Sequence, residues 1–204
     1  MFITFEGPEG AGKSTALAAI AERLRSRGFS VLTTREPGAG EFGRNIRQIL
    51  LHGDDIDPKA ELLLFLADRS NHVASIVRPA LESGTIVLCD RYADSTIVYQ
   101  AYARGLDLEF ARTGNQFATG GLVPDLTLLF DLEPEIGLSR LTSKDRLDGQ
   151  SIEFHRKVRD GFLTEAAREP HRWSKVDASQ APDQVLESAW SLIESKIKQE
   201  FSNE

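Results

Sequence analysis

The chain has little cysteine and no excess of positive charge. Cys89 is the only cysteine among 204 residues, which excludes an intrachain disulfide and a cysteine-rich metal site. Lysine and arginine together number 24 against 31 aspartates and glutamates, and the net charge is −7. This acidic balance argues against the backbone of a nucleic acid as the main partner, although local arginines can still oppose the overall sign at a small anionic ligand.

Long hydrophobic runs and a basic leader are also missing. The densest apolar stretch, Leu62 to Ala67, is far too short to span a bilayer, and no basic segment precedes the apolar residues at the N-terminus. We therefore expect a cytoplasmic protein with no membrane partner. The length, without internal repeats or a proline-rich linker, predicts a single domain over residues 1–204.

The most specific pattern that is present lies near the N-terminus. Residues 7–14 read GPEGAGKS, which fits the nucleoside-triphosphate loop pattern GxxxxGK[ST]. A glycine-rich turn points backbone N–H groups into one concavity, and the helix that follows adds its positive N-terminal end. Lys13 can then reach the β- and γ-phosphates, and Ser14 can offer its hydroxyl to Mg²⁺. The predicted nucleotide-binding residues are Gly7, Gly10, Ala11, Gly12, Lys13, Ser14 and Thr15.

Apolar, β-branched segments alternate with helical patterns along the whole chain. The expected strands are Phe2–Phe5, Phe29–Thr34, Thr85–Asp90, Leu126–Leu132 and Lys175–Asp177. This alternation predicts an α/β, doubly wound, five-stranded parallel sheet with helices on both faces. In such a sheet, ligands bind at the carboxyl ends of the strands.

Polar residues follow three of the expected strands, where we expect them to converge on one crevice. The first set is the phosphate loop, the second is Arg35 to Gly38, and the third is Asp90 to Tyr92. Asp90 lies where a phosphate-loop enzyme places the acid that orients magnesium or its water shell, and the alternative is a helix cap or a turn. Arg91 offers a fork of donors to phosphate oxygens, and the alternative is a surface ion pair.

Two further segments indicate ligand contacts. Phe65 and Arg69 are four residues apart on an expected helix, so the ring and the guanidinium share one face and can clamp a base, unless Phe65 is simply a core residue. Residues 140–150 are rich in charged side chains, among them Arg140, Lys144 and Arg146. This segment is either a short lid that closes on ATP or a solvated face.

Several motifs in order along the chain resemble the thymidylate kinase family in its bacterial form. They are residues 5–15, 34–38, 65–69, 90–96, 99–100 and 124–127, and the similarity covers nearly the whole chain. The resemblance implies the fold of the P-loop nucleoside monophosphate kinases. It also implies transfer of the γ-phosphoryl group from ATP to dTMP with Mg²⁺, in dTTP biosynthesis, by a homodimer. The alternatives are another nucleoside or nucleoside-monophosphate kinase, or a P-loop ATPase switch.

The resemblance also implies roles for individual residues. It places the thymine ring against Phe65 and Arg69, with further substrate contacts at Glu36, Arg47, Arg91, Thr96, Tyr99 and Gln100. Ser14 and Asp90 would hold the metal. The implied catalytic residues are Lys13, Glu9, Arg91 and a cation from the lid. The lid is shorter than in close relatives and lacks an arginine, and its Asp-Arg-Leu setting favours Arg146 over Lys144 for that role.

Overall fold

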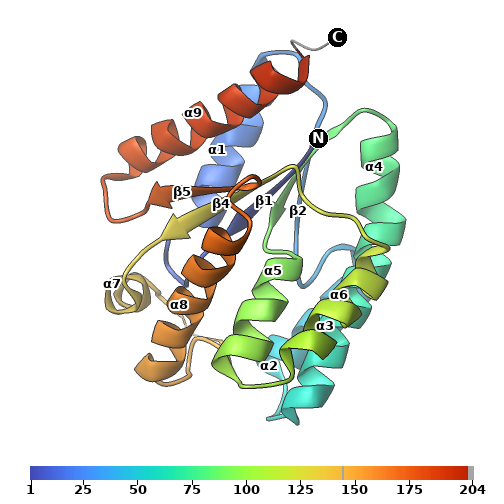
Figure 1. Ribbon diagram of the computed structural model, residues 1–204, viewed down its shortest axis with the longest axis vertical. Coiled ribbons are helices and arrows are strands. Elements are labelled where there is room, and N and C mark those ends of the chain that lie inside the picture. The colour runs from blue at the N-terminus through green and yellow to red at the C-terminus, as the bar shows by residue number, and fades with distance from the viewer. Residues whose placement is uncertain (144, 202–204) are drawn as a thin grey trace.

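A five-stranded parallel sheet organises the molecule, as predicted. The structure is a computed structural model that describes residues 1–143 and 145–201. The strand order is β2-β3-β1-β4-β5 (Figure 1). The strands are β1 (Phe2–Glu6), β2 (Val31–Arg35), β3 (Ile86–Asp90), β4 (Leu126–Asp131) and β5 (Trp173–Asp177). All four neighbouring pairs are parallel.

Helices connect the strands and cover both faces of the sheet. They are α1 (Lys13–Ser26), α2 (Gly40–His52), α3 (Pro58–His72), α4 (Arg78–Glu82), α5 (Ala93–Thr96), α6 (Leu108–Thr119), α7 (Pro134–Ser139), α8 (Ile152–Arg168) and α9 (Pro182–Phe201). Two π-helical segments, η1 (Val73–Val77) and η2 (Ile97–Ala103), continue α3 and α5. Within the described residues, none of the helices is long and apolar enough to cross a membrane.

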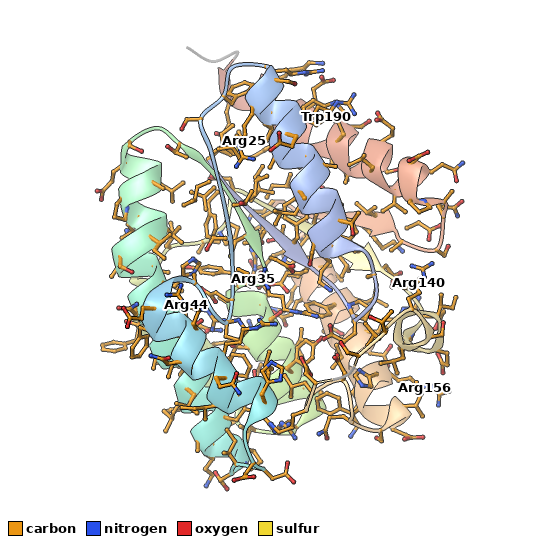
Figure 2. All side chains as sticks on the ribbon, turned by 180° about the vertical axis from the view of Figure 1, so that it is seen from behind. Arg25, Arg35, Arg44, Arg140, Arg156 and Trp190 are labelled. Atoms are coloured by element: carbon orange, nitrogen blue, oxygen red, sulfur yellow. The ribbon has the colours of Figure 1, made fainter. Side chains whose placement is uncertain are left out.

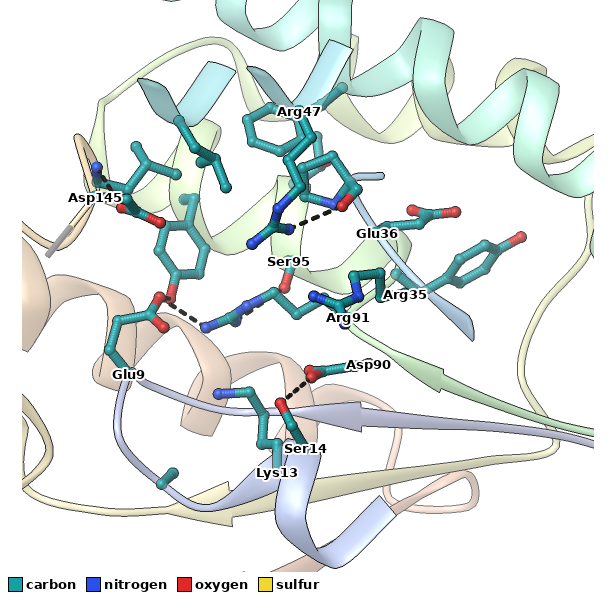
Figure 3. Close-up of a pocket in the computed structure, with 18 of the residues that line it drawn as sticks. Glu9, Lys13, Ser14, Arg35, Glu36, Arg47, Asp90, Arg91, Ser95 and Asp145 are labelled. Carbon is teal, nitrogen blue, oxygen red and sulfur yellow. Dashed lines mark hydrogen bonds and ion pairs between the residues drawn. The ribbon is translucent and has the colours of Figure 1, made fainter. Parts of the chain in front are cut away.

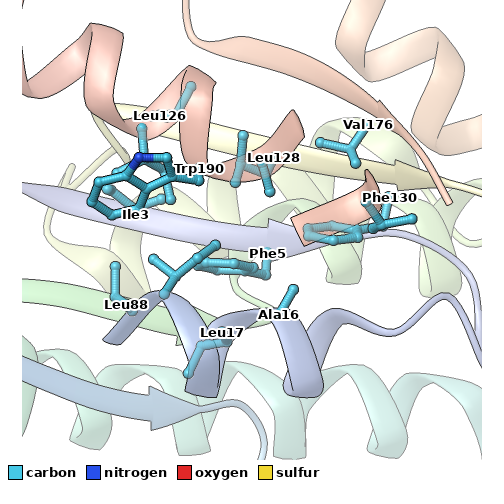
Figure 4. Packing of buried hydrophobic residues seen from close by; sticks show 14 of the residues in the cluster. Ile3, Phe5, Ala16, Leu17, Leu88, Leu126, Leu128, Phe130, Val176 and Trp190 are labelled. Carbon is cyan, nitrogen blue, oxygen red and sulfur yellow. The ribbon is translucent and has the colours of Figure 1, made fainter. Parts of the chain in front are cut away.

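One face of the sheet packs against α1 and α9. Alternate residues of each strand point to this side, so Ile3 and Phe5 of β1 meet Leu17 of α1 (Figure 4). Each such large apolar side chain, once buried, stabilises the fold by roughly 1.5–3 kcal/mol. Trp190 closes the end of this core, with the guanidinium groups of Arg23 and Arg27 at 4.3 and 4.5 Å from its ring; Figure 2 shows it on α9 beside α1.

The opposite face packs against the π-helical segments and α8. Val73 and Val77 of η1 cover Phe2, and Val158 of α8 covers Leu129 of β4. The register places Phe5 beside Asp90, so the loops after β1 and β3 leave the sheet at the same edge. That edge, flanked by α3, η2 and the 140–150 segment, is where the functional residues gather.

Candidate functional site

A cavity of about 340 Å³ lies at the carboxyl ends of β1, β2 and β3 (Figure 3). Its lining includes Lys13 of the phosphate loop, Glu36 after β2, Asp90 and Arg91 after β3, and Phe65 of α3. The predicted convergence of three strand ends on one crevice is therefore confirmed. The volume falls in the range typical of small-molecule sites.

The phosphate loop needs glycine because its backbone lies against other backbone. A Cβ atom on Gly7 would lie 2.4 Å from the carbonyl oxygen of Phe130, and one on Gly10 would lie 2.0 Å from that of Gly137. Both glycines have positive φ angles, of 138° and 68°. The second contact brings α7 directly against the loop. Gly137 lacks any motif of its own, and the sequence analysis missed it.

Lys13 lies buried at the base of the cavity. Its ammonium group donates to the carbonyl oxygens of Gly7 and Pro8 at 3.0 and 2.7 Å. Burial, together with the nearby Arg91, lowers the pKa of Lys13 to about 8. The side chain therefore stays mostly protonated at neutral pH, in the wall of the cavity that it lines.

Ser14 and Asp90, the two predicted metal ligands, lie next to each other. The Ser14 hydroxyl donates to Asp90 Oδ2 at 2.5 Å, and both residues line the cavity (Figure 3). Residues 1–143 and 145–201 contain no cluster of three or more histidine, cysteine or carboxylate side chains suited to a metal. A hydroxyl and one carboxylate fit Mg²⁺, which is usually held by one or two side chains together with phosphates and water.

Arg91 spans the mouth of the phosphate loop. Its guanidinium donates to the Gly7 carbonyl oxygen at 3.0 Å and to Glu9 Oε1 at 2.7 Å. The Tyr99 hydroxyl donates to the same Glu9 oxygen at 2.6 Å, and its ring lies 5.1 Å from the guanidinium. Burial alone would raise the pKa of Glu9, but Arg91 and Lys13 hold it at about 2. The backbone of Arg91 has φ 67°, a conformation rare for arginine and found mostly where function requires it.

Arg69 is buried at the inner wall, with its hydrogen-bonding capacity almost fully used. Nε donates to Glu36, and Nη1 donates to Thr96 and Asn115, over 2.7–2.8 Å. Nη2 gives one bond to the Tyr92 carbonyl oxygen at 3.0 Å. A guanidinium has five N–H groups, so one on Nη2 is left for a ligand in the cavity that Arg69 lines.

The remaining predicted substrate residues also border the cavity. Phe65 is half-buried against the apolar cluster of Ile46, Leu50, Leu51 and Leu147, and it lines the cavity. The Arg47 guanidinium donates to the Pro37 carbonyl oxygen at 2.9 Å, and both residues line the cavity. Gln100 lines the same wall, and its amide nitrogen donates to Glu61 Oε1 at 2.9 Å.

Arg146, the expected lid cation, does not line the cavity in this structure. Its guanidinium donates instead to Glu61 Oε2 at 2.5 Å and to the Leu50 carbonyl oxygen at 2.9 Å. The buried carboxylate of Glu61 attracts it away from the cavity. Lys144, the other candidate, lies outside the described residues. Arg140 donates to the Gly10 carbonyl oxygen at 3.4 Å, at the outer side of the loop.

Two buried polar residues behind the site, Glu61 and Asn115, were not predicted from the sequence. Glu61 precedes Phe65 and Arg69 by four and eight residues, so the three side chains lie on one stripe of α3. That spacing was the available signal. Asn115, which donates to the Ala93 carbonyl oxygen at 2.8 Å and accepts from Arg69, had none.

Comparison with known proteins gives one consistent result. The sequence model of a family described as thymidylate kinase matches residues 5–189. The chain is 51% identical over 197 residues to a thymidylate kinase of Synechococcus sp. (strain JA-2-3B'a(2-13)), covering 97% of this chain and 96% of that protein. It is 52% identical over 209 residues to one of Nitratidesulfovibrio vulgaris (strain DSM 19637 / Miyazaki F), covering 97% of each. The crystal structure of thymidylate kinase from Ehrlichia chaffeensis superimposes with a TM-score of 0.77 at 34% identity, covering 94% of this chain and 98% of that one.

Proposed function

The chain belongs to the thymidylate kinase family, and from this we propose that the cavity holds ATP and dTMP end to end. The enzyme is a nucleoside monophosphate kinase that phosphorylates dTMP to dTDP with ATP as donor. The triphosphate occupies the loop beside Lys13, and the thymine ring lies against Phe65. The observation that carries this arrangement is that one cavity is lined both by the phosphate loop and by the Phe65–Arg69 face of α3. The 1–204 chain acts as one kinase domain.

Phosphoryl transfer requires alignment of the two substrates and positive charge opposite the transferring group. Lys13 supplies one charge from the base of the cavity, and Arg91 supplies a second from its mouth. Glu9 holds the Arg91 guanidinium beside the loop, and Ser14 and Asp90, which lie next to each other, would hold Mg²⁺. The metal, when bound, neutralises charge on the β- and γ-phosphates. We keep Arg146 out of this set because its guanidinium bonds Glu61.

Arg69 and Gln100, on the wall of the cavity beside Phe65, offer hydrogen-bonding groups that match thymine. Arg69 has only donors, so its free N–H suits the O4 acceptor of thymine and opposes the N4 amino group of cytosine. The amide nitrogen of Gln100 is bonded to Glu61, so its carbonyl oxygen is the end that can accept from the thymine N3–H. Tyr99 crowds the sugar where a ribonucleotide carries its 2′-hydroxyl. Arg47, with Glu36, borders the sugar and acceptor phosphate.

An ADP-release assay across thymidine, dTMP, dUMP, dCMP, AMP, GMP and UMP tests the proposed function. We expect dTMP to give the highest kcat/KM. The 5-methyl group is worth only about 1–3 kcal/mol, so dUMP should be a poor substrate rather than an excluded one. Equal kcat/KM values for dTMP and dCMP would contradict the role of Arg69. ADP release that does not depend on any acceptor would indicate an ATPase switch instead.

We also propose that the enzyme is a cytoplasmic homodimer. The family resemblance suggests the dimer, and α3 and α6 carry three large apolar side chains that are more than half exposed to solvent. Leu63, Phe110 and Phe117 expose 55%, 52% and 88% of their surface. Phe110 and Phe117 are seven residues apart on α6, so both lie on one face of that helix. A second copy of the chain would cover this face.

A further inference from the structure

Glu61 is a buried carboxylate behind the base pocket. It does not line the cavity, but it contacts Gln100, which does. It sits on α3 with none of its surface exposed. Oε1 accepts from the Gln100 amide nitrogen at 2.9 Å and from Arg104 Nε at 2.7 Å. Oε2 accepts from Arg104 Nη2 at 2.9 Å and from Arg146 Nη2 at 2.5 Å. Four hydrogen bonds from three residues therefore meet on one side chain.

The two arginines keep this carboxylate ionised. Burial favours the neutral acid, but the hydrogen bonds from Arg104, Arg146 and Gln100 outweigh it and place the pKa of Glu61 below its ordinary value. An ionised carboxylate can only accept hydrogen bonds. The group that Gln100 turns toward it must therefore be the NH₂ end of the amide.

This contact decides what Gln100 offers to a ligand. A primary amide has a donor end and an acceptor end of nearly the same shape, and either can face a cavity. Because Glu61 takes the donor end, the carbonyl oxygen remains for the cavity that Gln100 lines. A flipped amide would put that oxygen against the carboxylate, which is repulsive in a buried site.

We propose that Glu61 is a positioning residue that fixes the orientation of the Gln100 amide and thereby sets the preference of the pocket for thymine over cytosine. The inference rests on the proposed function, since it concerns the acceptor base. Thymine and uracil present an N3–H donor, whereas cytosine presents a bare N3 acceptor. A fixed carbonyl oxygen on Gln100 pairs with the first and opposes the second.

Glu61→Gln is the direct test. The neutral side chain can offer a carbonyl oxygen or an amino group, so it no longer dictates which end of Gln100 faces the cavity. We expect the ratio of kcat/KM for dTMP over dCMP to fall on the order of tenfold, mainly through a higher KM for dTMP and a lower KM for dCMP. Binding of dTMP and dCMP measured by calorimetry without ATP should change in the same ratio.

Glu165→Gln is the matched control. Glu165 is also buried and accepts from the Tyr102 hydroxyl at 2.8 Å and from Arg112 at 2.7 Å, but it does not line the cavity. We expect E165Q to lose stability without changing the dTMP/dCMP ratio. If E61Q and E165Q leave the ratio equally unchanged, Glu61 is only a structural residue and the inference is wrong.

Two further variants keep the inference testable if E61Q does not fold. Glu61→Asp retains the charge that both arginines need, but its shorter side chain draws back from the Gln100 amide, so the ratio should fall in the same direction. In the Gln100→Leu background, changing Glu61 should no longer alter the ratio, because the amide it acts on is gone. An unchanged ratio in E61D overturns the proposal. A wild-type enzyme that is inactive on dTMP would instead overturn the proposed function.

Discussion

Arg91 contacts several of the groups that surround the phosphate loop. It joins the Gly7 carbonyl oxygen, the Glu9 carboxylate and the Tyr99 ring, and it holds this position with a strained backbone. Glu9 and Tyr99 therefore hold the guanidinium in place before any substrate arrives. A charge fixed in this way stabilises a transition state more than a mobile one, because it needs no reorganisation during the reaction.

Replacing Arg91 by alanine should therefore remove a preorganised charge from phosphoryl transfer. We expect kcat/KM for dTMP to fall by about several hundredfold, most of it in kcat. The measurement is steady-state ADP release with ATP and dTMP. Arg112→Ala is the control, because Arg112 also pairs with a glutamate but lies outside the cavity, and it should change kcat/KM little. A loss below about tenfold in R91A would exclude Arg91 from the mechanism.

Among single residues, sequence patterns predict best those that belong to a motif. Lys13, Ser14, Asp90 and Arg91 all reach the cavity as expected. Arg146 does not reach the cavity, because its guanidinium bonds Glu61, which is distant in sequence and has no motif of its own. A short motif specifies its own local geometry. The orientation of a long side chain depends on partners that only the fold brings near.

At the scale of elements, the contact between α7 and the phosphate loop is the closest in the site. A Cβ atom on Gly137 would lie 2.1 Å from the Glu9 carbonyl oxygen, and one on Gly10 would lie 2.0 Å from the Gly137 carbonyl oxygen. Both partners are backbone atoms, so no side chain can move aside. The position of the loop is therefore tied to the helix that leads into the 140–150 segment.

Gly137→Ala should push α7 away from the loop. We expect the free energy of unfolding to fall by about 1–3 kcal/mol, as is usual when a well-packed site is overfilled. Relative to the wild type, the KM for ATP should rise more than the KM for dTMP. Thermal unfolding and steady-state kinetics measure the two effects. Gly149→Ala is the control, since its Cβ would meet the Asp145 carbonyl oxygen at an ordinary 3.5 Å. If ATP binding in G137A equals that in G149A, α7 does not support the loop.

The elements themselves were largely predictable from sequence. All five strands fall within a few residues of the segments that predicted them. The reason is clearest for β1, β3 and β4, which are buried on both faces and therefore read as nearly continuous apolar runs. The helix expected around Phe65 and Arg69 is α3, and η1 and α4 continue it without a break. Hydrophobic periodicity locates such a helical run but does not reveal the π-helical turn inside it, which depends on the pairing of individual backbone groups.

At the scale of the whole molecule, three exposed apolar side chains lie on two helices that pack together, α3 and α6. Phe117, the most exposed of the large hydrophobic side chains, lies on α6, which packs beside α3 on the side of the sheet away from α1 and α9 (Figure 1). Leu63 of α3 and Phe110 of α6 are also more than half exposed. Leaving these side chains in water is unfavourable, and covering them with the same face of a second copy would produce a symmetric dimer.

Phe117→Glu should disrupt such a dimer, because it places an unpaired charge where the partner would bury an aromatic ring. We expect the wild-type enzyme to have the mass of a dimer in light scattering at micromolar concentration. The dissociation constant of F117E should rise by about a hundredfold or more, giving monomers at the same concentration. Ser188→Glu adds the same charge to α9, on the opposite side of the sheet, and should leave the dimer intact. If F117E and S188E have the same mass as the wild type, the dimer forms through another face. A monomeric wild-type enzyme would mean that the apolar face remains uncovered.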